Sequence, residues 1–129
     1  MKSKFQMVLA ALIVLATGWS SIAAADDVDN CTWSNAEALV KTNPSVVTSA
    51  CRRLARAGET WAQYNLATIY DKGLGVTPNY IEAAKWYRRA ANKGHPQAQY
   101  NLGRLYANGK GLGADFVEAY KWFTIAARA

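Results

Sequence analysis

The sequence predicts an all-α protein, an α/α solenoid of stacked helical hairpins. The first observation is that residues 58–93 and residues 94–129 align without a gap at a period of 36. The second is that apolar residues in each copy recur at three- and four-residue steps, as they do on one face of a helix. The third is a glycine-rich connection in the middle of each copy. Periods of about 20 to 50 residues are typical of arrays in which each unit buries its apolar face against its neighbours.

Each copy reads as helix, tight connection and helix. Ala62, Leu66 and Ile69 share one face of the first helix, and Ala98, Leu102 and Leu105 repeat that stripe. The second helices carry the stripes Ala83, Trp86, Tyr87, Ala90, Ala91 and Ala119, Trp122, Phe123, Ala126, Ala127. Residues 72–78 and 108–114 lie between the two stripes, and their glycines, with a proline in the first, cannot continue a helix at low cost.

These residues also carry a family resemblance. The pattern A-x-x-x-L-x-x-x-Y-x-x-G-x-G, followed by E-A-x-K-W-[YF]-x-x-A-A, resembles the Sel-one-like repeat, and it covers residues 58–129 in two consecutive copies. The resemblance implies a superhelix related to tetratricopeptide repeats. It also implies a protein-interaction scaffold, often exported in bacteria, without naming the partner.

The first 25 residues are typical of a signal peptide. Lys2 and Lys4 precede an apolar run over residues 7–17, and residues 23–25 are alanines, which predicts cleavage before Asp26. The alternative is an uncleaved anchor, but the strongly apolar run is about 11 residues where a membrane span needs about 20. We therefore expect a periplasmic or secreted protein that meets a membrane only through this segment before cleavage. Export also disfavours nucleic acid as a partner.

Residues 26–129 then form one small domain. Its formal charge falls from +6 to +4, because two lysines leave and all nine acidic residues stay. Cys31 and Cys51 are the only cysteines, and an even count in an oxidising compartment predicts a disulfide. A redox or metal-binding pair is the alternative, but there is no C-x-x-C spacing and few other ligands lie near.

Residues 26–57 are predicted to be a degenerate hairpin that caps the array. Ser34 to Glu37 matches a capping box, and Asn43 followed by Pro44 predicts the start of a second helix. The disulfide would tie these two helices together. The apolar stripe of the second helix is Val46, Val47, Ala50, Cys51 and Leu54.

The second full copy, by contrast, ends at Ala129 with no polar helix after it. Arrays usually carry a polar terminal unit for solubility. This leads to the hypothesis that the C-terminal edge takes part in self-association or in docking a partner.

Catalytic chemistry is not indicated. The only histidine, His95, lies at a repeat junction where a turn residue is expected, and the serines outside the signal segment are Ser34, Ser45 and Ser49. Residues 109–113 read G-x-G-x-G after a helix rather than G-x-G-x-x-G after a strand, so a structural turn is favoured over a phosphate site. We therefore expect no catalytic residue, no metal and no cofactor.

Two surfaces are candidates for binding. The first helices present a stripe that would line the groove of a tetratricopeptide-like array, although its tyrosines could instead pack between repeats; the candidates are Tyr64, Thr68, Asp71, Tyr100 and Arg104. A basic strip on the second helices is either a solvated face or a docking site for an acidic protein, anionic lipid or polyanionic glycan. Its members are Arg52, Arg53, Arg56, Arg88, Arg89 and Lys93.

The function expected from these features is that of an exported protein–protein interaction module or scaffold in the bacterial envelope or outside the cell. One form of it would be an envelope regulator acting through a membrane sensor. The alternative is a binder or hydrolase of cell-wall fragments or penicillin-like small molecules, which would need a polar pocket.

Overall fold

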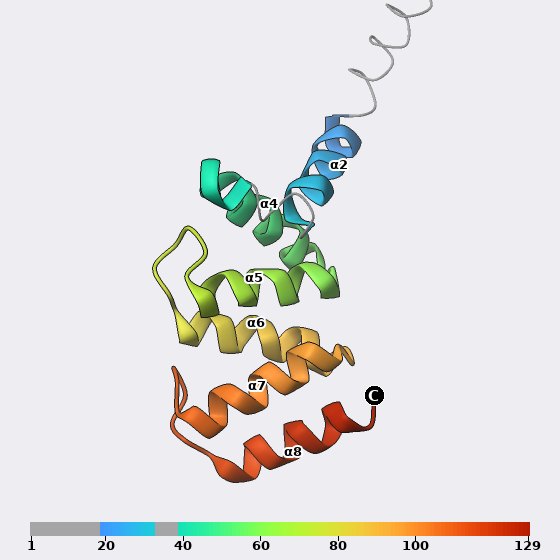
Figure 1. The fold of residues 1–129 in the computed structure, drawn as a ribbon. Coiled ribbons are helices and arrows are strands. Elements are labelled where there is room, and N and C mark those ends of the chain that lie inside the picture. The colour runs from blue at the N-terminus through green and yellow to red at the C-terminus, as the bar shows by residue number, and fades with distance from the viewer. Residues whose placement is uncertain (1–18, 33–38) are drawn as a thin grey trace, which may run out of the picture.

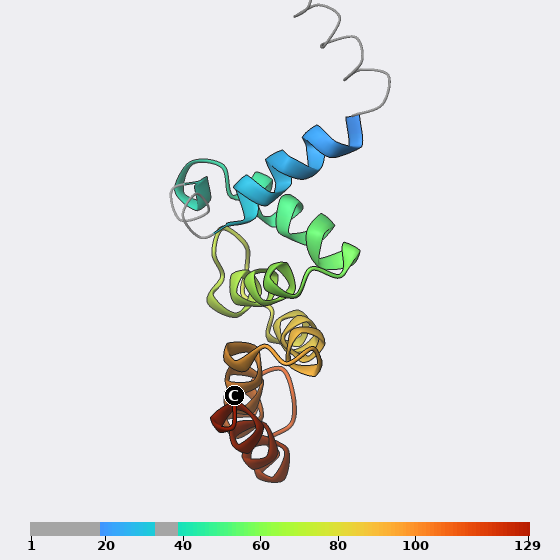
Figure 2. The same ribbon diagram turned by 90° about the vertical axis from the view of Figure 1, so that its right-hand side faces the viewer.

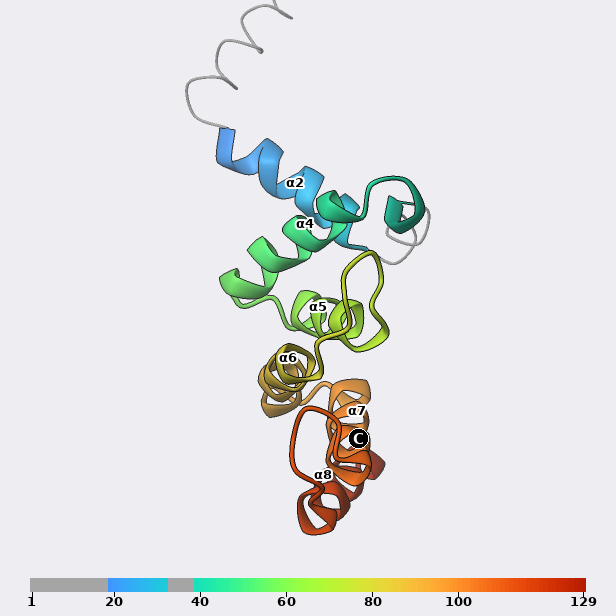
Figure 3. The same cartoon turned by 90° about the vertical axis from the view of Figure 1, so that its left-hand side faces the viewer.

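The computed structural model describes residues 19–32 and 39–129, and this part of the chain consists of helices and connections without strands. The helices follow one another in chain order along an elongated stack, with α8 at the opposite end from α2 (Figures 1, 2 and 3). The predicted α/α solenoid is therefore confirmed. Its helices are α2 (Trp19–Cys31), α4 (Pro44–Ala57), α5 (Thr60–Lys72), α6 (Tyr80–Asn92), α7 (Pro96–Asn108) and α8 (Phe116–Ala127).

The second helix of each hairpin begins at a polar side chain that caps it. Asn79 Oδ1 accepts a hydrogen bond from the Glu82 N–H at 3.0 Å, and Asp115 accepts from the N–H groups of Val117 and Glu118. These contacts satisfy backbone donors that the first turn of a helix leaves without intrahelical partners. The polar residues Asn79 and Asp115 thus set where α6 and α8 start.

The predicted apolar stripes form the core, with one exception. The five stripe residues of α6 are all buried, as are Ala62, Leu66 and Ile69 of α5. In α8 only Ala119 and Trp122 are buried, while Phe123 and Ala126 are half-buried and Ala127 is exposed. The difference arises because α7 covers the equivalent face of α6, and no later described helix covers α8.

Neighbouring hairpins contact each other through a set of hydrogen bonds that repeats at the period of 36. Gln63 Nε2 donates to the Ala55 carbonyl at 3.1 Å, and Gln99 Nε2 donates to the Ala91 carbonyl at 3.1 Å. The contact between α4 and α5 therefore matches the contact between α6 and α7.

Arginine–tyrosine pairs repeat in the same way. Arg52 Nη2 donates to the Tyr70 hydroxyl at 2.7 Å, and Arg88 Nη2 donates to the Tyr106 hydroxyl. Each arginine lies on a second helix, and each tyrosine lies on the first helix of the next hairpin. Thr124 occupies the equivalent position of α8, so α8 lacks this arginine.

The glycine-rich connections also contact equivalent positions in neighbouring units. A Cβ at Gly75 would lie 2.0 Å from the Pro44 Cβ, and a Cβ at Gly111 would lie 2.5 Å from the Tyr80 carbonyl carbon. Pro44 and Tyr80 are the first residues of α4 and α6. Because these contacts also keep the 36-residue period, α4 occupies the place of a second helix in a preceding unit.

The partner of α4 differs from the expected one. The first helix of the predicted cap begins at a capping box over residues 34–37, which lie outside the described residues, and residues 39–42 are helical. The helix that precedes α4 in the stack and packs against it is α2 (Figure 1). The Cys31–Cys51 disulfide joins α2 to α4, with a Cα–Cα distance of 4.9 Å. The predicted disulfide thus joins α4 to a helix that includes residues 26–31 of the predicted cap, and not to the helix that the capping box predicts.

An ion pair supports the same contact. Asp27 on α2 is buried, and its carboxylate accepts from Arg53 Nε on α4 at 2.6 Å. This hydrogen bond holds the pKa of Asp27 below its ordinary value and raises that of Arg53. Both Asp27 and Cys31 follow the predicted cleavage point, so these links to α4 do not need the residues before it.

The signal segment lies mostly outside the described residues, which begin at Trp19. The helix α2 runs continuously across the predicted cleavage point before Asp26. In the part of the chain that the structure covers, none of the helices has the length and apolar character that a bilayer crossing requires. Cleavage therefore stays a prediction.

Candidate functional site

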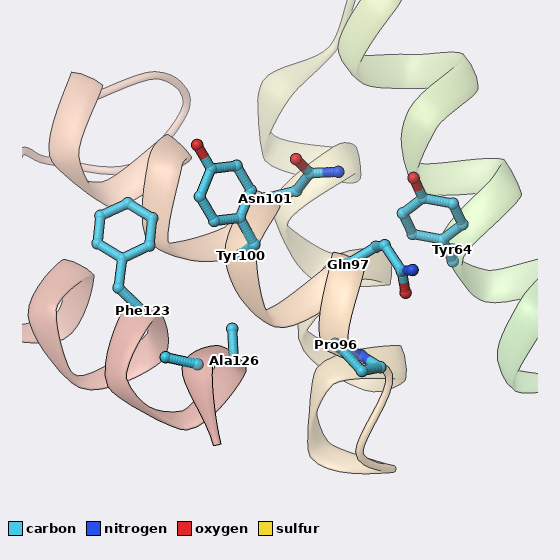
Figure 4. Close-up of a pocket in the computed structure, with 8 residues that line it drawn as sticks. Tyr64, Pro96, Gln97, Tyr100, Asn101, Phe123 and Ala126 are labelled. Carbon is cyan, nitrogen blue, oxygen red and sulfur yellow. The ribbon is translucent and has the colours of Figure 1, made fainter. Parts of the chain in front are cut away.

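Two adjoining hollows form a groove along α5, α7 and α8, and Tyr64 and Asn101 line both of them. We call the first the apolar hollow. It has a volume of about 670 Å³ and is lined by Tyr64, Pro96, Gln97, Tyr100, Asn101, Phe123, Ala126 and Ala127 (Figure 4). We call the second the polar hollow. It has a volume of about 420 Å³ and is lined by Tyr64, Thr68, Asp71, Lys72, Tyr80, Tyr87, Asn101, Arg104 and Lys110.

Aromatic rings from three helices line the apolar hollow. Tyr100 of α7 is 55% exposed, and its ring centroid lies 5.4 Å from that of Phe123 on α8. Gly103 makes this arrangement possible, because a Cβ there would lie 2.9 Å from the Phe123 ring. Figure 4 shows Tyr64 on the other side of the hollow, carried by α5. The result is an open apolar surface with aromatic walls.

A hydrogen-bonded network forms the floor of the polar hollow. Asp71 of α5 pairs with Arg104 of α7 and accepts from the Tyr87 hydroxyl of α6 at 3.2 Å. The Tyr87 hydroxyl also lies 3.2 Å from Thr68 Oγ1. Burial raises the pKa of Tyr87 far above its ordinary value, so its phenol stays protonated and can donate to Asp71. The network therefore ties three helices together beneath the groove.

Positive charge predominates in the polar hollow. Lys72, Arg104 and Lys110 line it together with a single carboxylate, that of Asp71. Arg104 is already paired with Asp71, while Lys72 is exposed and forms no ion pair with another described residue. The Lys110 Nζ lies 5.0 Å above the centroid of the Tyr80 ring. The two lysines thus leave the polar hollow with unbalanced positive charge.

The contrast between the hollows comes from differences between the two repeats. At a period of 36, Asp71 corresponds to Ala107, and Tyr87 corresponds to Phe123. The first repeat therefore supplies a carboxylate and a hydroxyl where the second supplies a methyl group and a ring without a hydroxyl. The same fold position gives a polar floor in one unit and an apolar wall in the next.

The structure places the predicted groove residues on this surface, with different roles. Tyr64 is half-buried and its ring stacks on His95 with centroids 4.6 Å apart, so it also packs between repeats. Thr68 and Asp71 are 3% and 8% exposed and bond within the protein, which makes them the floor rather than a contact surface. Of the predicted groove residues, Tyr100 is the one with a largely exposed ring.

Sequence reasoning missed several groove residues. Asn101 and Lys72 each adjoin a predicted residue, and Phe123 was assigned only to the core. The available signal was helical spacing: Lys72 lies four residues after Thr68 and Asn101 lies three residues before Arg104, and residues so spaced share a helix face. Lys110 lies in a glycine-rich connection, so helical spacing could not place it.

The predicted basic strip does not form one free surface. Arg52 and Arg88 bind tyrosines of the next hairpin, and Arg53 pairs with Asp27. The Arg89 guanidinium lies 4.5 Å from the centroid of the Trp86 ring, and Lys93 donates to the Gly58 carbonyl. Arg56 is exposed without such a contact among the described residues. Most of these cations therefore hold helices together.

His95 has a structural role. Its Nδ1 accepts a hydrogen bond from the Ala98 N–H at 3.3 Å and so caps α7. Burial lowers the pKa of His95, which favours the neutral ring that this cap requires. Across residues 19–32 and 39–129, no three residues among histidine, cysteine, aspartate and glutamate gather into a metal-binding group.

The helix order, the repeated contacts and the groove define a helical-repeat protein of the α/α solenoid class. Comparison with protein families matches the Sel1 repeat to residues 62–95 and again to residues 96–129. These matches cover more than half of the chain, and the chain belongs to the Sel1 repeat family. Members of this family generally mediate protein–protein interactions and are typically non-catalytic.

Two solved structures show the same architecture. A Sel1 repeat protein from Oxalobacter formigenes is 31% identical with a TM-score of 0.62, covering 64% of this chain and 63% of its own. A protective antigen present in uropathogenic Escherichia coli strains, displaying an SLR fold, is 44% identical with a TM-score of 0.64. That match covers 65% of this chain but only 18% of the antigen. Comparison with curated protein sequences finds no match.

Proposed function

We propose that this protein is exported and binds another polypeptide of the bacterial envelope or extracellular space through the groove formed by α5, α7 and α8. The observation that carries the proposal is the open aromatic surface of the apolar hollow, with Tyr100 55% exposed beside Phe123. Tyrosine is frequent among the residues that dominate binding energies at protein interfaces. The groove lies on a floor fixed by internal bonds, so little of it needs to become ordered on binding.

Export is supported by two features of the N-terminal part. Residues 1–25 have the charge, apolar run and alanine site of a signal peptide. The disulfide between Cys31 and Cys51 is of a kind that persists in oxidising compartments. Fractionation of cells that express the full chain tests this part of the proposal. Processing before Asp26 with recovery outside the cytoplasm is expected, and retention in the cytoplasm would contradict it.

A matched pair of variants tests groove binding. The purified chain is immobilised and exposed to an envelope extract, and bound proteins are quantified by mass spectrometry. Tyr100→Ala is expected to abolish retention of the specific partner. Ile81→Ala is the control, because Ile81 on α6 is 65% exposed but lines neither hollow. Equal retention by the wild type and by Tyr100→Ala would show that the groove is not the binding surface.

The C-terminal edge supports a further part of the proposal, association with a second copy. On α8, Phe116, Val117 and Tyr120 are 73%, 78% and 74% exposed. Tyr120 corresponds to Ala84, which is only 3% exposed in the preceding unit. The only charged side chains within α8, those of Glu118 and Lys121, pair with each other at 3.3 Å. A second copy offers the same apolar, charge-balanced face.

A further inference from the structure

One position of the repeat already binds polypeptide backbone within this chain. The Asn65 side chain of α5 is buried, and its Nδ2 donates to the carbonyl of Cys31 at 2.8 Å. The accepting carbonyl belongs to the last residue of α2, a segment outside the two repeats. The first repeat therefore uses this asparagine to hold a separate stretch of chain.

The second repeat carries the same asparagine, but there its side chain lines the groove. Asn101 lies 36 residues after Asn65, in the equivalent turn of α7. Its side chain is half-buried, lines both hollows and forms no hydrogen bond with another described residue. An amide offers both donors and acceptors, so it can bind a backbone carbonyl as Asn65 does.

We propose that the groove binds an extended acidic–apolar segment of a partner protein, with Asn101 bonding to its backbone. This proposal rests on the function proposed above and specifies its ligand. A carboxylate of the segment enters the polar hollow, and an aliphatic or aromatic side chain enters the apolar hollow.

Charge complementarity selects the carboxylate. Asp71 already neutralises Arg104, so Lys72 and Lys110 remain to balance an incoming anion. An uncharged group would leave this excess positive charge uncompensated, and a cationic group would be repelled.

The aromatic walls select the apolar side chain. Tyr100 and Phe123 offer ring faces, while Ala126 and Ala127 add methyl groups, and no ionisable carboxylate or amine lines the apolar hollow. Because the two hollows meet at Asn101, the acidic and apolar residues lie on either side of the bonded backbone. In an extended segment, where alternate side chains point the same way, this corresponds to a separation of about two to four residues.

The test is selection from a random peptide library displayed on phage, panned against the full chain with its disulfide intact. The expected result is enrichment of sequences with aspartate or glutamate near an aliphatic or aromatic residue. A selected peptide labelled with fluorescein is then titrated by anisotropy. Asn101→Ala is expected to weaken its binding about tenfold, as loss of a directed hydrogen bond does. Asn108→Ala, on the same helix but outside both hollows, is the control and should leave affinity unchanged.

A double variant separates the contribution of the two lysine charges from that of the Asn101 hydrogen bond. Replacing Lys72 and Lys110 with alanine should weaken binding and remove most of its salt dependence, and panning this variant should no longer enrich acidic residues. Selected peptides without an acidic preference, no selected peptide, or equal affinity for the wild type and Asn101→Ala would each overturn the inference. The envelope experiment then decides the proposed function separately. If Tyr100→Ala still abolishes retention of a partner there, the groove binds a protein, but not through an acidic–apolar segment.

Discussion

Removing the disulfide gives a prediction whose size follows from the structure. Cys31 and Cys51 are separated by 20 residues, and both side chains are fully buried. Closing a loop of this length reduces the conformational entropy of the unfolded chain and contributes about 3.3 kcal/mol at 25 °C in the chain-entropy treatment. The variant Cys31→Ala/Cys51→Ala is expected to lose about this free energy of unfolding. It should still fold, because the Asp27–Arg53 pair and the Asn65 hydrogen bond also hold α2.

The assay is urea unfolding followed by circular dichroism, with the oxidised wild type, the reduced wild type and the double variant compared at equal concentration. Reduction should move the wild type to the midpoint of the double variant, and the same reductant should not affect the double variant. A difference below about 1 kcal/mol between oxidised and reduced wild type would refute the reasoning, since the loop term alone exceeds it.

Three further outcomes are expected. Gly111→Ala should lower the free energy of unfolding by about 2 kcal/mol in urea unfolding, because Gly111 has φ +70° and an added Cβ would lie 2.5 Å from the Tyr80 backbone. The control is Gly113→Ala, whose added Cβ would meet nothing within 4 Å. It should change the free energy of unfolding by less than about 0.5 kcal/mol. Lowering the pH through 6.5, the ordinary pKa of histidine, should reduce stability, because the unfolded chain takes up a proton on His95 while burial keeps the folded ring neutral. His95→Asn should remove this part of the pH dependence of the urea midpoint, and an unchanged profile would contradict the assignment. Phe116→Asp should reduce the weight-average mass in sedimentation equilibrium at high concentration, and a wild type that stays monomeric there would exclude self-association through α8.

Much of the fold could be predicted because the repeat shows each pattern twice. The stripe of Ala62, Leu66 and Ile69 recurs one period later, which distinguishes a helix face from chance spacing. The glycine connections mark the ends of α5 and α7 for the same reason. The segment before Pro44 has no second copy to compare, so the helix that packs against α4 could be predicted only in part. The role of α2 against α4 was missed because residues 1–25 read as a targeting segment.

The groove was only partly predictable, because its polarity depends on contacts between helices. Helical spacing placed Tyr64 and Tyr100 on one face, and both line the apolar hollow. It could not show that Asp71 would be neutralised by Arg104 from the next hairpin, which turns a candidate contact into part of the floor. Nor could it show that Phe123, expected in the core, lines an open hollow, since that depends on which helix covers α8.

The most direct test of groove binding is nuclear magnetic resonance of the side-chain amides in ¹⁵N-labelled protein during titration with a selected peptide. The amide resonance of Asn101 should shift, together with backbone signals of Tyr100 and Lys110. The Asn65 amide should stay unchanged, because it already bonds to the Cys31 carbonyl. Shifts confined to the outer face of α8, or a silent Asn101 with saturated peptide, would contradict the account.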